Sequence, residues 1–454
     1  MARVGSGETR KLSQFAVALS FADLPMSVVE QTKLVILDTI GVIVAASRYP
    51  AGQLLASFVQ AEDAKKEASV IGSTVKTSAV NAAFTNGTMG HDMELDDVHF
   101  ASNTHAAAVI VPAALAVAEK LGSDGKSLIL AVSTAYDVQC RISIALDDSL
   151  QYARAFHPTC VCGNFGAATA AAKLLNLNLE RFLWALGLAG SQACGLNAWE
   201  NEPDHYVKSF QTGVPARNGV TAALLAAKGY KASDNILDGP YNVFDAFSGQ
   251  YSFAGLVEEL GSRWEILRTS MKKYACCRYI HAPLDAFLGI MEDEGLDVAD
   301  IDTVTVKLSI TGAPIVDGNE LFTHNCQYAL AVAAYDGVIT REQFSPARRK
   351  DPAVWELANR IQLLGVTELE AVYPEIWGAI VEVNTKSGQH YSKRVDYAKG
   401  SPENPMTAAE IKDKFMGLCR GVLGDAKSQR IYHLILELES VTNIKELMAL
   451  LAAE

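Results

Sequence analysis

Hydrophobic residues recur at intervals of three and four through about the first 265 positions of the chain, the spacing of one face of an α-helix. Several of these patterns end at a glycine, and Pro112 fits the first turn of a helix, where proline is tolerated. We therefore predict an all-helical first half, with helices that include residues 27–47, 81–97, 112–122, 126–146, 164–177 and 179–196.

The periodicity changes in the next part of the chain. Residues 302–310, "DTVTVKLSI", alternate between apolar and polar positions, which is typical of a half-buried β-strand. Residues 379–397 predict two further strands joined by a Ser-Gly turn. Helical patterns at 281–295 and 326–337 lie around these strands. This part of the chain is therefore expected to form a smaller α+β unit.

Helical patterns return near the end of the chain. The segment "SPENPM" interrupts the sequence, and Thr407 with Glu410 then predicts a capping box at the start of a new helix. Further apolar spacing predicts helices over 411–424 and near 443–451.

A chain of 454 residues is too long for one ordinary hydrophobic core. We predict a mainly α fold, in which a large all-helical domain carries an inserted smaller α+β domain. The helical domain is expected to comprise residues 1–266 plus 399–454, and the α+β domain residues 267–398.

Composition narrows the functional classes. The chain is 49% hydrophobic and 20% charged, which is typical of a globular protein. Its net charge of -13 argues against binding to nucleic acid or to an anionic membrane, although a local cluster of basic residues could still bind a small anion. The first residues lack the apolar region of a secretory signal, and no apolar run approaches the length of a membrane span. We expect a cytoplasmic protein.

Eight cysteines show no framework spacing, which favours reduced thiols and argues against a Cys-ligated metal. The densest group of titratable residues lies instead at 90–105, "GHDMELDDVHFASNTH", which holds four carboxylates and three histidines. We interpret Asp92 and Glu94 as the solvated end of a helix. Asp96, Asp97 and the histidines that follow run directly into an apolar segment, so we expect them to line a cleft.

Two chemistries suit this group. The three histidines lack the i, i+4 spacing of a helical metal pair, so the indication of a metal is weak. A histidine whose ring is oriented by a carboxylate can act as a general acid or base. We therefore favour proton transfer.

Four blocks of sequence, taken in order, resemble the MmgE/PrpD family, which contains 2-methylcitrate dehydratases, cis-aconitate decarboxylases and iminodisuccinate epimerase. They begin "GHDMELDDVHFASNTHAAAVIVPAA", "FHPTCVCGNFG", "VKSFQTGVPARNG" and "KKYACCRYIHAPLDA". The resemblance implies a helical domain built from both chain ends, an inserted α+β domain, a cleft between them and a homodimer. It also implies chemistry next to a carboxylate, without a metal or an organic cofactor.

The resemblance also implies which residues form the site. His105 and His157 match histidines that we expect to transfer protons, and Lys208 and Lys272 match lysines that we expect to hold carboxylates and stabilise charge. Tyr328 matches a family tyrosine, although its apolar surroundings fit a core position equally well.

Four further residues complete the expected site. Asp96 or Asp97 is expected to orient the His105 ring, and Arg278 and His281 are expected to bind substrate, with a purely structural role for His281 as the alternative.

The sequence departs from the family pattern around this site, for example at Val98, Cys160 and Ala275, so the motifs indicate the fold more directly than the reaction. We expect a di- or tricarboxylate substrate and a hydro-lyase of the 2-methylcitrate dehydratase type. An epimerase, a decarboxylase and a catalytically silent binding protein are the alternatives, in that order.

Overall fold

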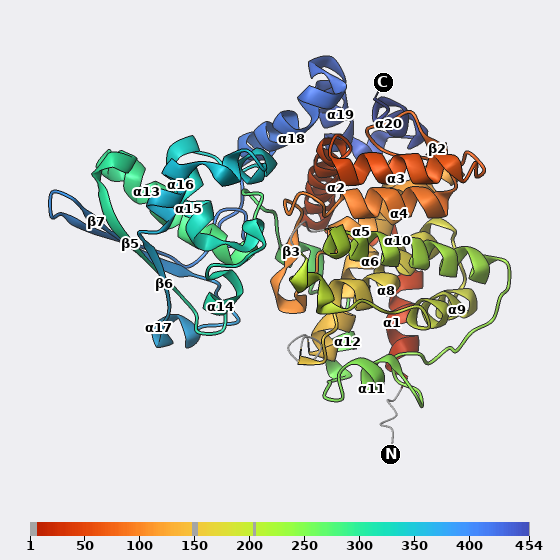
Figure 1. Cartoon of the computed structure of the whole chain (residues 1–454). Helices are drawn as coiled ribbons and strands as arrows, with labels where there is room; N and C mark the ends of the chain where they lie inside the picture. The colour runs from red at the N-terminus through yellow and green to blue at the C-terminus, as the bar shows by residue number, and fades with distance from the viewer. Residues whose placement is uncertain (1–6, 148–152, 203–205, 454) are drawn as a thin grey trace.

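A computed structural model describes residues 7–147, 153–202 and 206–453 of the chain (Figure 1). The first part is helical, as its periodicity predicts. Its helices are α1 (Glu8–Ala18), α2 (Met26–Ala46), α3 (Pro50–Ala61), α4 (Ala79–Met89), α5 (Ala106–Leu121), α6 (Gly125–Leu146), α8 (Pro158–Leu174), α9 (Leu179–Gly190), α10 (Tyr206–Ala227), α11 (Val243–Phe247) and α12 (Ala254–Val257). Short strand pairs join β1 (Ala68–Ser69) to β2 (Lys76–Thr77) and β3 (Val98–His99) to β4 (Thr269–Ser270).

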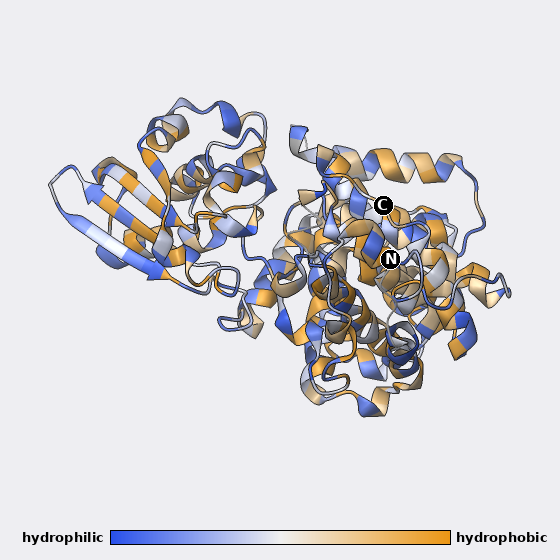
Figure 2. Ribbon diagram, turned by 90° about the horizontal axis from the view of Figure 1, so that it is seen from below, coloured by the Kyte–Doolittle hydropathy of each residue, from blue (hydrophilic) through white to orange (hydrophobic). Residues whose placement is uncertain are grey.

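Helix α8 lies at the centre of this helical domain, where α5, α6, α9 and α10 pack around it. Its alanines are fully or almost fully buried, and Gly219 of α10 lies directly against Ala167, where a Cβ would not fit. This close approach fixes α10, which carries Lys208, against the helix that follows His157. Figure 2 shows hydrophobic residues gathered in this helical part of the molecule.

Several predicted helix boundaries are wrong, and the helix expected over 179–196 ends at Gly190. The helix expected over 81–97 ends at Met89, and residues 90–105 form an irregular connection in which Glu94 has a φ of +51°. Helix α5 begins at Ala106, so Pro112 lies inside it and not in its first turn. A proline inside a helix removes one backbone hydrogen bond, and the surrounding buried residues of α5 outweigh this cost through packing.

The α+β unit is built on a four-stranded sheet with the order β6-β5-β7-β8. Strands β5 and β6 are parallel, whereas β7 is antiparallel to both β5 and β8. The predicted strand at 302–310 and the predicted hairpin at 379–397 are both confirmed. The elements are α13 (His281–Glu294), β5 (Ile301–Leu308), α14 (Ala313–Val316), α15 (Cys326–Asp336), α16 (Pro352–Ala358), β6 (Ile361–Gly365), α17 (Thr367–Glu370), β7 (Ala379–Thr385) and β8 (His390–Val395).

The chain then returns to the helical part through α18 (Ala408–Leu423), α19 (Asp425–Leu436) and α20 (Lys445–Leu450). The predicted capping box at the start of α18 is present. Helices α18 and α19 pack against α2, and α20 packs against α5 (Figure 1). The mainly α fold class with a smaller α+β unit is thus confirmed, while the exact domain boundaries stay a prediction.

Among the described residues, helix α6 alone has the length and hydropathy that a membrane span requires. The most apolar window of α6 is 89% buried within the protein. This degree of burial is typical of a core helix.

Candidate active site

The connection between α4 and α5, residues 90–105, lies in the interior of the molecule. Its β3 strand pairs with β4, which brings the connection beside the chain that leads to Lys272. Asp92 and Glu94 are only 3% and 1% exposed, so their interpretation as a solvated helix end is wrong. Carboxylates buried to this extent require cations or hydrogen-bond donors around them.

Two lysines bind the carboxylate of Glu94. The Lys272 ammonium lies 2.7 Å from Oε2 and also donates a hydrogen bond of 2.9 Å to the Glu94 carbonyl oxygen. The Lys208 ammonium donates to Oε1 of the same carboxylate. Burial disfavours the charged form of Lys272, but Glu94 and Asp96 outweigh it and raise the pKa of this lysine. The lysines, which come from distant parts of the chain, therefore share one carboxylate.

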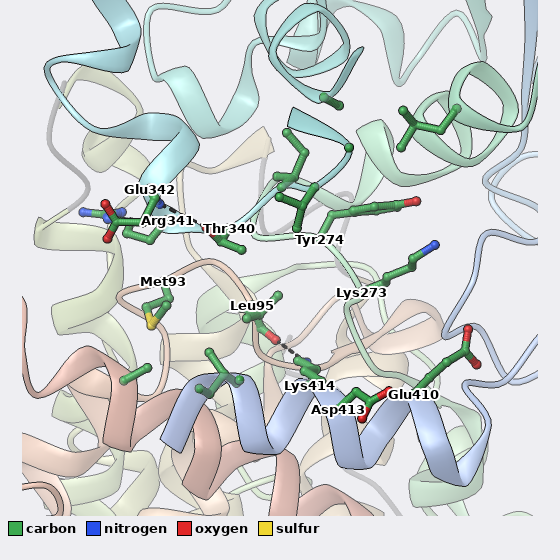
Figure 3. Close-up of a pocket in the computed structure, with 18 of the residues that line it drawn as sticks. Met93, Leu95, Lys273, Tyr274, Thr340, Arg341, Glu342, Glu410, Asp413 and Lys414 are labelled. Atoms are coloured by element: carbon green, nitrogen blue, oxygen red, sulfur yellow. Dashed lines mark hydrogen bonds between the residues drawn. The ribbon is translucent and has the colours of Figure 1, made fainter. Parts of the chain in front are cut away.

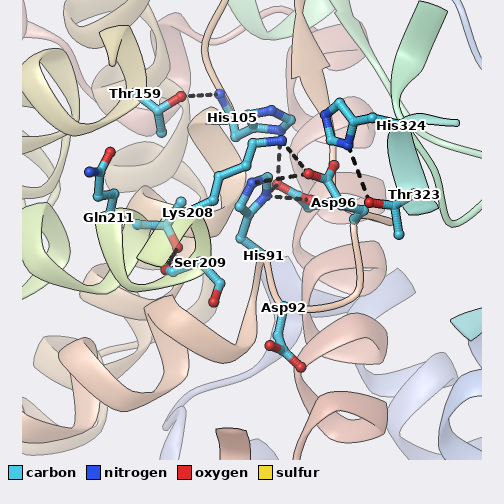
Figure 4. Close-up of polar contacts among 12 residues, drawn as sticks. His91, Asp92, Asp96, His105, Thr159, Lys208, Ser209, Gln211, Thr323 and His324 are labelled. Carbon is cyan, nitrogen blue, oxygen red and sulfur yellow. Dashed lines mark hydrogen bonds and ion pairs between the residues drawn. The ribbon is translucent and has the colours of Figure 1, made fainter. Parts of the chain in front are cut away.

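Asp96 holds two histidines (Figure 4). Its carboxylate oxygens both lie 2.9 Å from Nδ1 of His91, and Oδ2 lies 3.1 Å from Nδ1 of His105. The His105 Nδ1 atom is also 2.9 Å from the Asp97 carbonyl oxygen. Burial opposes ionisation of Asp96, but the two histidines lower its pKa well below the ordinary value. Because Nδ1 of His105 faces these acceptors, Nε2 is the atom left for proton transfer.

Asp97 has a supporting role. Its carboxylate accepts hydrogen bonds from Tyr136, Thr269 and the Ala107 backbone, at 2.7, 2.5 and 3.0 Å. These bonds fix the start of α5, and with it the position of His105. Of the two candidates, the Asp96 carboxylate contacts the His105 ring.

His157 precedes α8, but its side chain does not cap that helix. Its Nδ1 lies 2.9 Å from Oε1 of Gln211, whose amide nitrogen donates to the Leu196 carbonyl oxygen at 2.8 Å. This orientation of the amide requires His157 to donate through Nδ1, which leaves Nε2 as an acceptor. Burial and then the charge of Lys208 hold the pKa of His157 well below its ordinary value. His157 is therefore a neutral base.

Several contacts join these groups into one site. The His105 backbone nitrogen donates to Thr159 at 3.1 Å, two residues after His157. The Trp199 ring lies 5.7 Å from the His157 ring and 4.9 Å from the Lys208 ammonium. The fold thus brings together five of the residues predicted from the sequence, which are His105, His157, Lys208, Lys272 and Asp96. Sequence reasoning did not assign roles to His91, Glu94, Trp199, Gln211 and His324, of which His324 has its ring centre 6.4 Å from that of Trp199 (Figure 4).

Three further candidates make other contacts, and Arg278 also lies 5.4 Å from the centre of the Phe100 ring in the connection. Arg278 contacts His281 at 2.8 Å and donates to Ser401 at 2.6 Å, so both residues support the chain that returns to the helical domain. Tyr328 is fully buried among aromatic rings of the α+β unit and donates to the Gln343 carbonyl oxygen at 2.6 Å. Its position is that of a core residue, which was the alternative interpretation of its sequence.

A cavity of about 1270 Å³ lies behind the connection, between α2, α18 and the α+β unit (Figure 3). Met93 and Leu95 face it, whereas Glu94 between them faces the lysines. The acidic side chains that line the cavity outnumber the basic ones, which disfavours the binding of a polycarboxylate there. These charged lining residues are Asp285, Glu292, Glu342, Glu410 and Asp413 against Arg48, Lys273, Arg341 and Lys414. The lysine and histidine cluster is therefore the better candidate for the active site.

His91, Asp96 and His105 place ligand atoms within 4.8 Å of one another and could hold a metal ion. Both histidines already turn Nδ1 toward Asp96, and Lys272 interacts with the same carboxylate. A cation at this position would be repelled by the two ammonium groups. The arrangement suits proton transfer and the binding of a carboxylate better than it suits a metal.

The chain is similar to several known enzymes. A cis-aconitate decarboxylase from Aspergillus terreus is 29% identical over 473 residues, covering 98% of this chain and 96% of its own. The cis-aconitate decarboxylase-like protein oryM of Aspergillus oryzae is 28% identical, with 98% and 97% coverage. The cis-aconitate decarboxylase of Homo sapiens is 25% identical, with 95% and 92% coverage.

Two family models match successive parts of the chain. Residues 10–255 match the MmgE/PrpD N-terminal domain, and residues 274–439 match the MmgE/PrpD C-terminal domain. The second match begins just before α13 and continues through α18 and α19, so it includes helices that pack against α2. The chain belongs to the MmgE/PrpD family, whose members act on carboxylates.

Proposed function

We propose that the protein is a lyase that decarboxylates an unsaturated tricarboxylate of the cis-aconitate type without a metal or an organic cofactor. The observation that carries this proposal is the convergence of two buried lysines, Lys208 and Lys272, on one carboxylate. A cluster that holds the carboxylate of Glu94 in this way has the charge and the donors to hold a substrate carboxylate. Ammonium groups offset the desolvation of such a ligand in a protein of net charge -13.

The reaction requires one proton for each carbon dioxide released. When the carbon–carbon bond to the departing carboxylate breaks, its electron pair moves into the adjacent double-bond system, and a carbon at the far end takes a proton. We assign the donation to Nε2 of His105, because Asp96 orients this ring through Nδ1. His157, which is neutral and carries an acceptor at Nε2, is assigned to the relay that restores the proton.

The lysines have the complementary role. They bind the carboxylates that remain on the product and stabilise the charge that spreads onto them in the transition state. Decarboxylation is preferred to dehydration, which the sequence placed first, because the curated relatives that match along 95–98% of this chain are named for decarboxylation of cis-aconitate.

The test is an incubation of the protein in deuterated water with cis-aconitate, 2-methylcitrate and iminodisuccinate, followed by NMR. We expect release of carbon dioxide from cis-aconitate and a methylene product that carries one deuterium. Alkene formation from 2-methylcitrate without carbon dioxide would instead identify a hydro-lyase. Exchange at the carbon of iminodisuccinate with inversion would identify an epimerase, and no reaction with any of them would favour a binding protein.

A further inference from the structure

Two cysteines lie against each other beside His157. Cys160 is in the first turn of α8 and is 1% exposed, whereas Cys194 lies after α9 and is exposed. Their thiols share a hydrogen bond. The backbone of Gly195, which has a φ of +116°, runs so close that a Cβ there would lie 2.8 Å from Cys160 Sγ. The chain at Cys194 and Gly195 is therefore held beside Cys160 in the folded protein.

The two thiols differ in reactivity. The hydrogen bond from Cys160 stabilises the Cys194 thiolate. Partial burial opposes this effect, and the guanidinium of Arg217 adds to it. The pKa of Cys194 therefore falls to about 7. The same hydrogen bond and burial raise the pKa of Cys160. A thiolate that is accessible and lies beside a second thiol has the arrangement of a redox-sensitive pair.

We propose that Cys194 and Cys160 form a reversible disulfide when the protein meets a hydroperoxide. The Cys194 thiolate attacks one peroxide oxygen, so a sulfur–oxygen bond forms and the oxygen–oxygen bond breaks, releasing hydroxide. Cys160 then gives up its proton to that hydroxide and attacks the Cys194 sulfur. The disulfide forms, the sulfur–oxygen bond breaks and water leaves after protonation. Two thiols and one hydrogen peroxide thus yield one disulfide and two waters.

The disulfide would act on His157, because both supports of this histidine belong to the chain next to Cys194. The His157 backbone nitrogen donates to the Gly195 carbonyl oxygen at 3.1 Å. Gln211, which orients the His157 ring, is held by the Leu196 carbonyl oxygen. A bond that draws Cys194 toward α8 displaces these two carbonyl groups. We expect kcat to fall about tenfold to 10²-fold, since small displacements of a catalytic group have effects of this size.

Formation of the disulfide does not depend on the proposed reaction, whereas its effect on kcat does. The full-length protein is treated with hydrogen peroxide or with dithiothreitol, alkylated, digested without reduction and analysed by mass spectrometry. We expect a peptide linking residues 160 and 194 that lacks two hydrogen atoms, together with a fall in kcat that dithiothreitol reverses. Cys194→Ser should abolish the link and keep kcat constant under peroxide.

Two more variants complete the experiment. Cys160→Ser should leave Cys194 as a sulfenic acid that dimedone labels, and Cys419→Ser, in the distant helix α18, should behave as the unchanged protein. Oxidation of Cys194 to a sulfinic acid while Cys160 stays a free thiol would overturn the proposal, as would absence of the linked peptide. A linked peptide with unchanged kcat would refute the effect on His157. The linked peptide is measured without substrate, so it survives a failure of the proposed reaction.

Discussion

The ammonium group of Lys272 lies 2.7 Å from Oε2 of Glu94, and both side chains are only 1% exposed. A substrate carboxylate must therefore share or replace this partner. Glu94→Gln removes the competing charge and leaves the lysines free to bind an anion. We expect a tricarboxylate to bind about tenfold more tightly, as measured by isothermal titration calorimetry, since one close charge pair is worth roughly 1 kcal/mol or more.

Glu119→Gln is the matched control for this variant. Glu119 is also buried, but it pairs with Lys76 and Ser69 and does not contact Lys208 or Lys272. It should lower thermal stability without changing the affinity for the tricarboxylate. If Glu94→Gln weakened binding, Glu94 would be a part of the binding site and not its competitor.

Substitutions of the lysines and of the histidines are expected to change different kinetic constants. Lys208→Ala should raise KM for a polycarboxylate, because the ammonium binds substrate charge. His105→Ala and His157→Ala should mainly lower kcat, by the roughly 10²–10⁴-fold typical of a lost acid or base. Steady-state kinetics with circular dichroism as a folding control would show this. Near-normal kcat in both histidine variants would rule out the site described here.

Metal independence is a separate expectation. Prolonged chelation should leave turnover unchanged, because the lysines and histidines supply the charge and the proton that the reaction needs. The measurements are the turnover rate and the metal content of the active protein, determined by elemental analysis. If chelation stopped turnover and a stoichiometric divalent ion restored it, His91, Asp96 and His105 would be its ligands.

Stability should depend on pH through Asp137 of α6. Burial raises its pKa to about 7, although Arg141 opposes the shift. Between about pH 4, the unfolded value, and pH 7 the folded protein binds more protons, so the contribution of this group to stability falls as the pH rises. Asp137→Asn should therefore gain stability relative to the unchanged protein, by up to about 1 kcal/mol per pH unit. Urea denaturation at pH 5, 6, 7 and 8 would measure the difference.

Lys414 of α18 links the chain end to the site. Its ammonium lies 2.6 Å from Oδ1 of Asp38 and donates to the carbonyl oxygens of Leu95 and Lys272 at 3.1 and 2.7 Å. Lys414→Met leaves Asp38 as an unpaired buried charge and should cost about 3–5 kcal/mol in the free energy of unfolding. The double variant Lys414→Met with Asp38→Asn should lose less. Equal losses in both would show that the backbone bonds, and not the ion pair, carry the effect.

The spacing of hydrophobic positions was sufficient to predict the fold class, because buried positions repeat every 3.6 residues in helices and every two residues in strands. It found the hairpin of β7 and β8 but not β6, whose five residues are too few for a clear period. Pro112 was placed wrongly because the packing of α5 overrides a local preference. The homodimer and the cytoplasmic location stay predictions.

The site was only partly accessible from sequence. His105, His157, Lys208 and Lys272 follow from motifs, because their neighbours in the chain are distinctive. Glu94 was missed, since a glutamate between Met93 and Leu95 looks like a surface residue unless the partners contributed by α10 and the chain after β4 are known. Those partners are 114 and 178 positions away in the chain, and a local pattern cannot reveal them.

The three bonds made by Lys414 have a consequence for how the protein could acquire new substrates. Substrate selectivity is usually attributed to residues that contact the ligand. Here, however, Lys414 of α18 donates hydrogen bonds to the backbone of residues 90–105, at Leu95, and to the backbone of Lys272. A substitution in α18 could shift the ion pair between Lys272 and Glu94 without replacing any side chain that contacts the substrate. Laboratory evolution toward different polycarboxylates should accordingly recover substitutions in this helix as well as among the lysines and histidines.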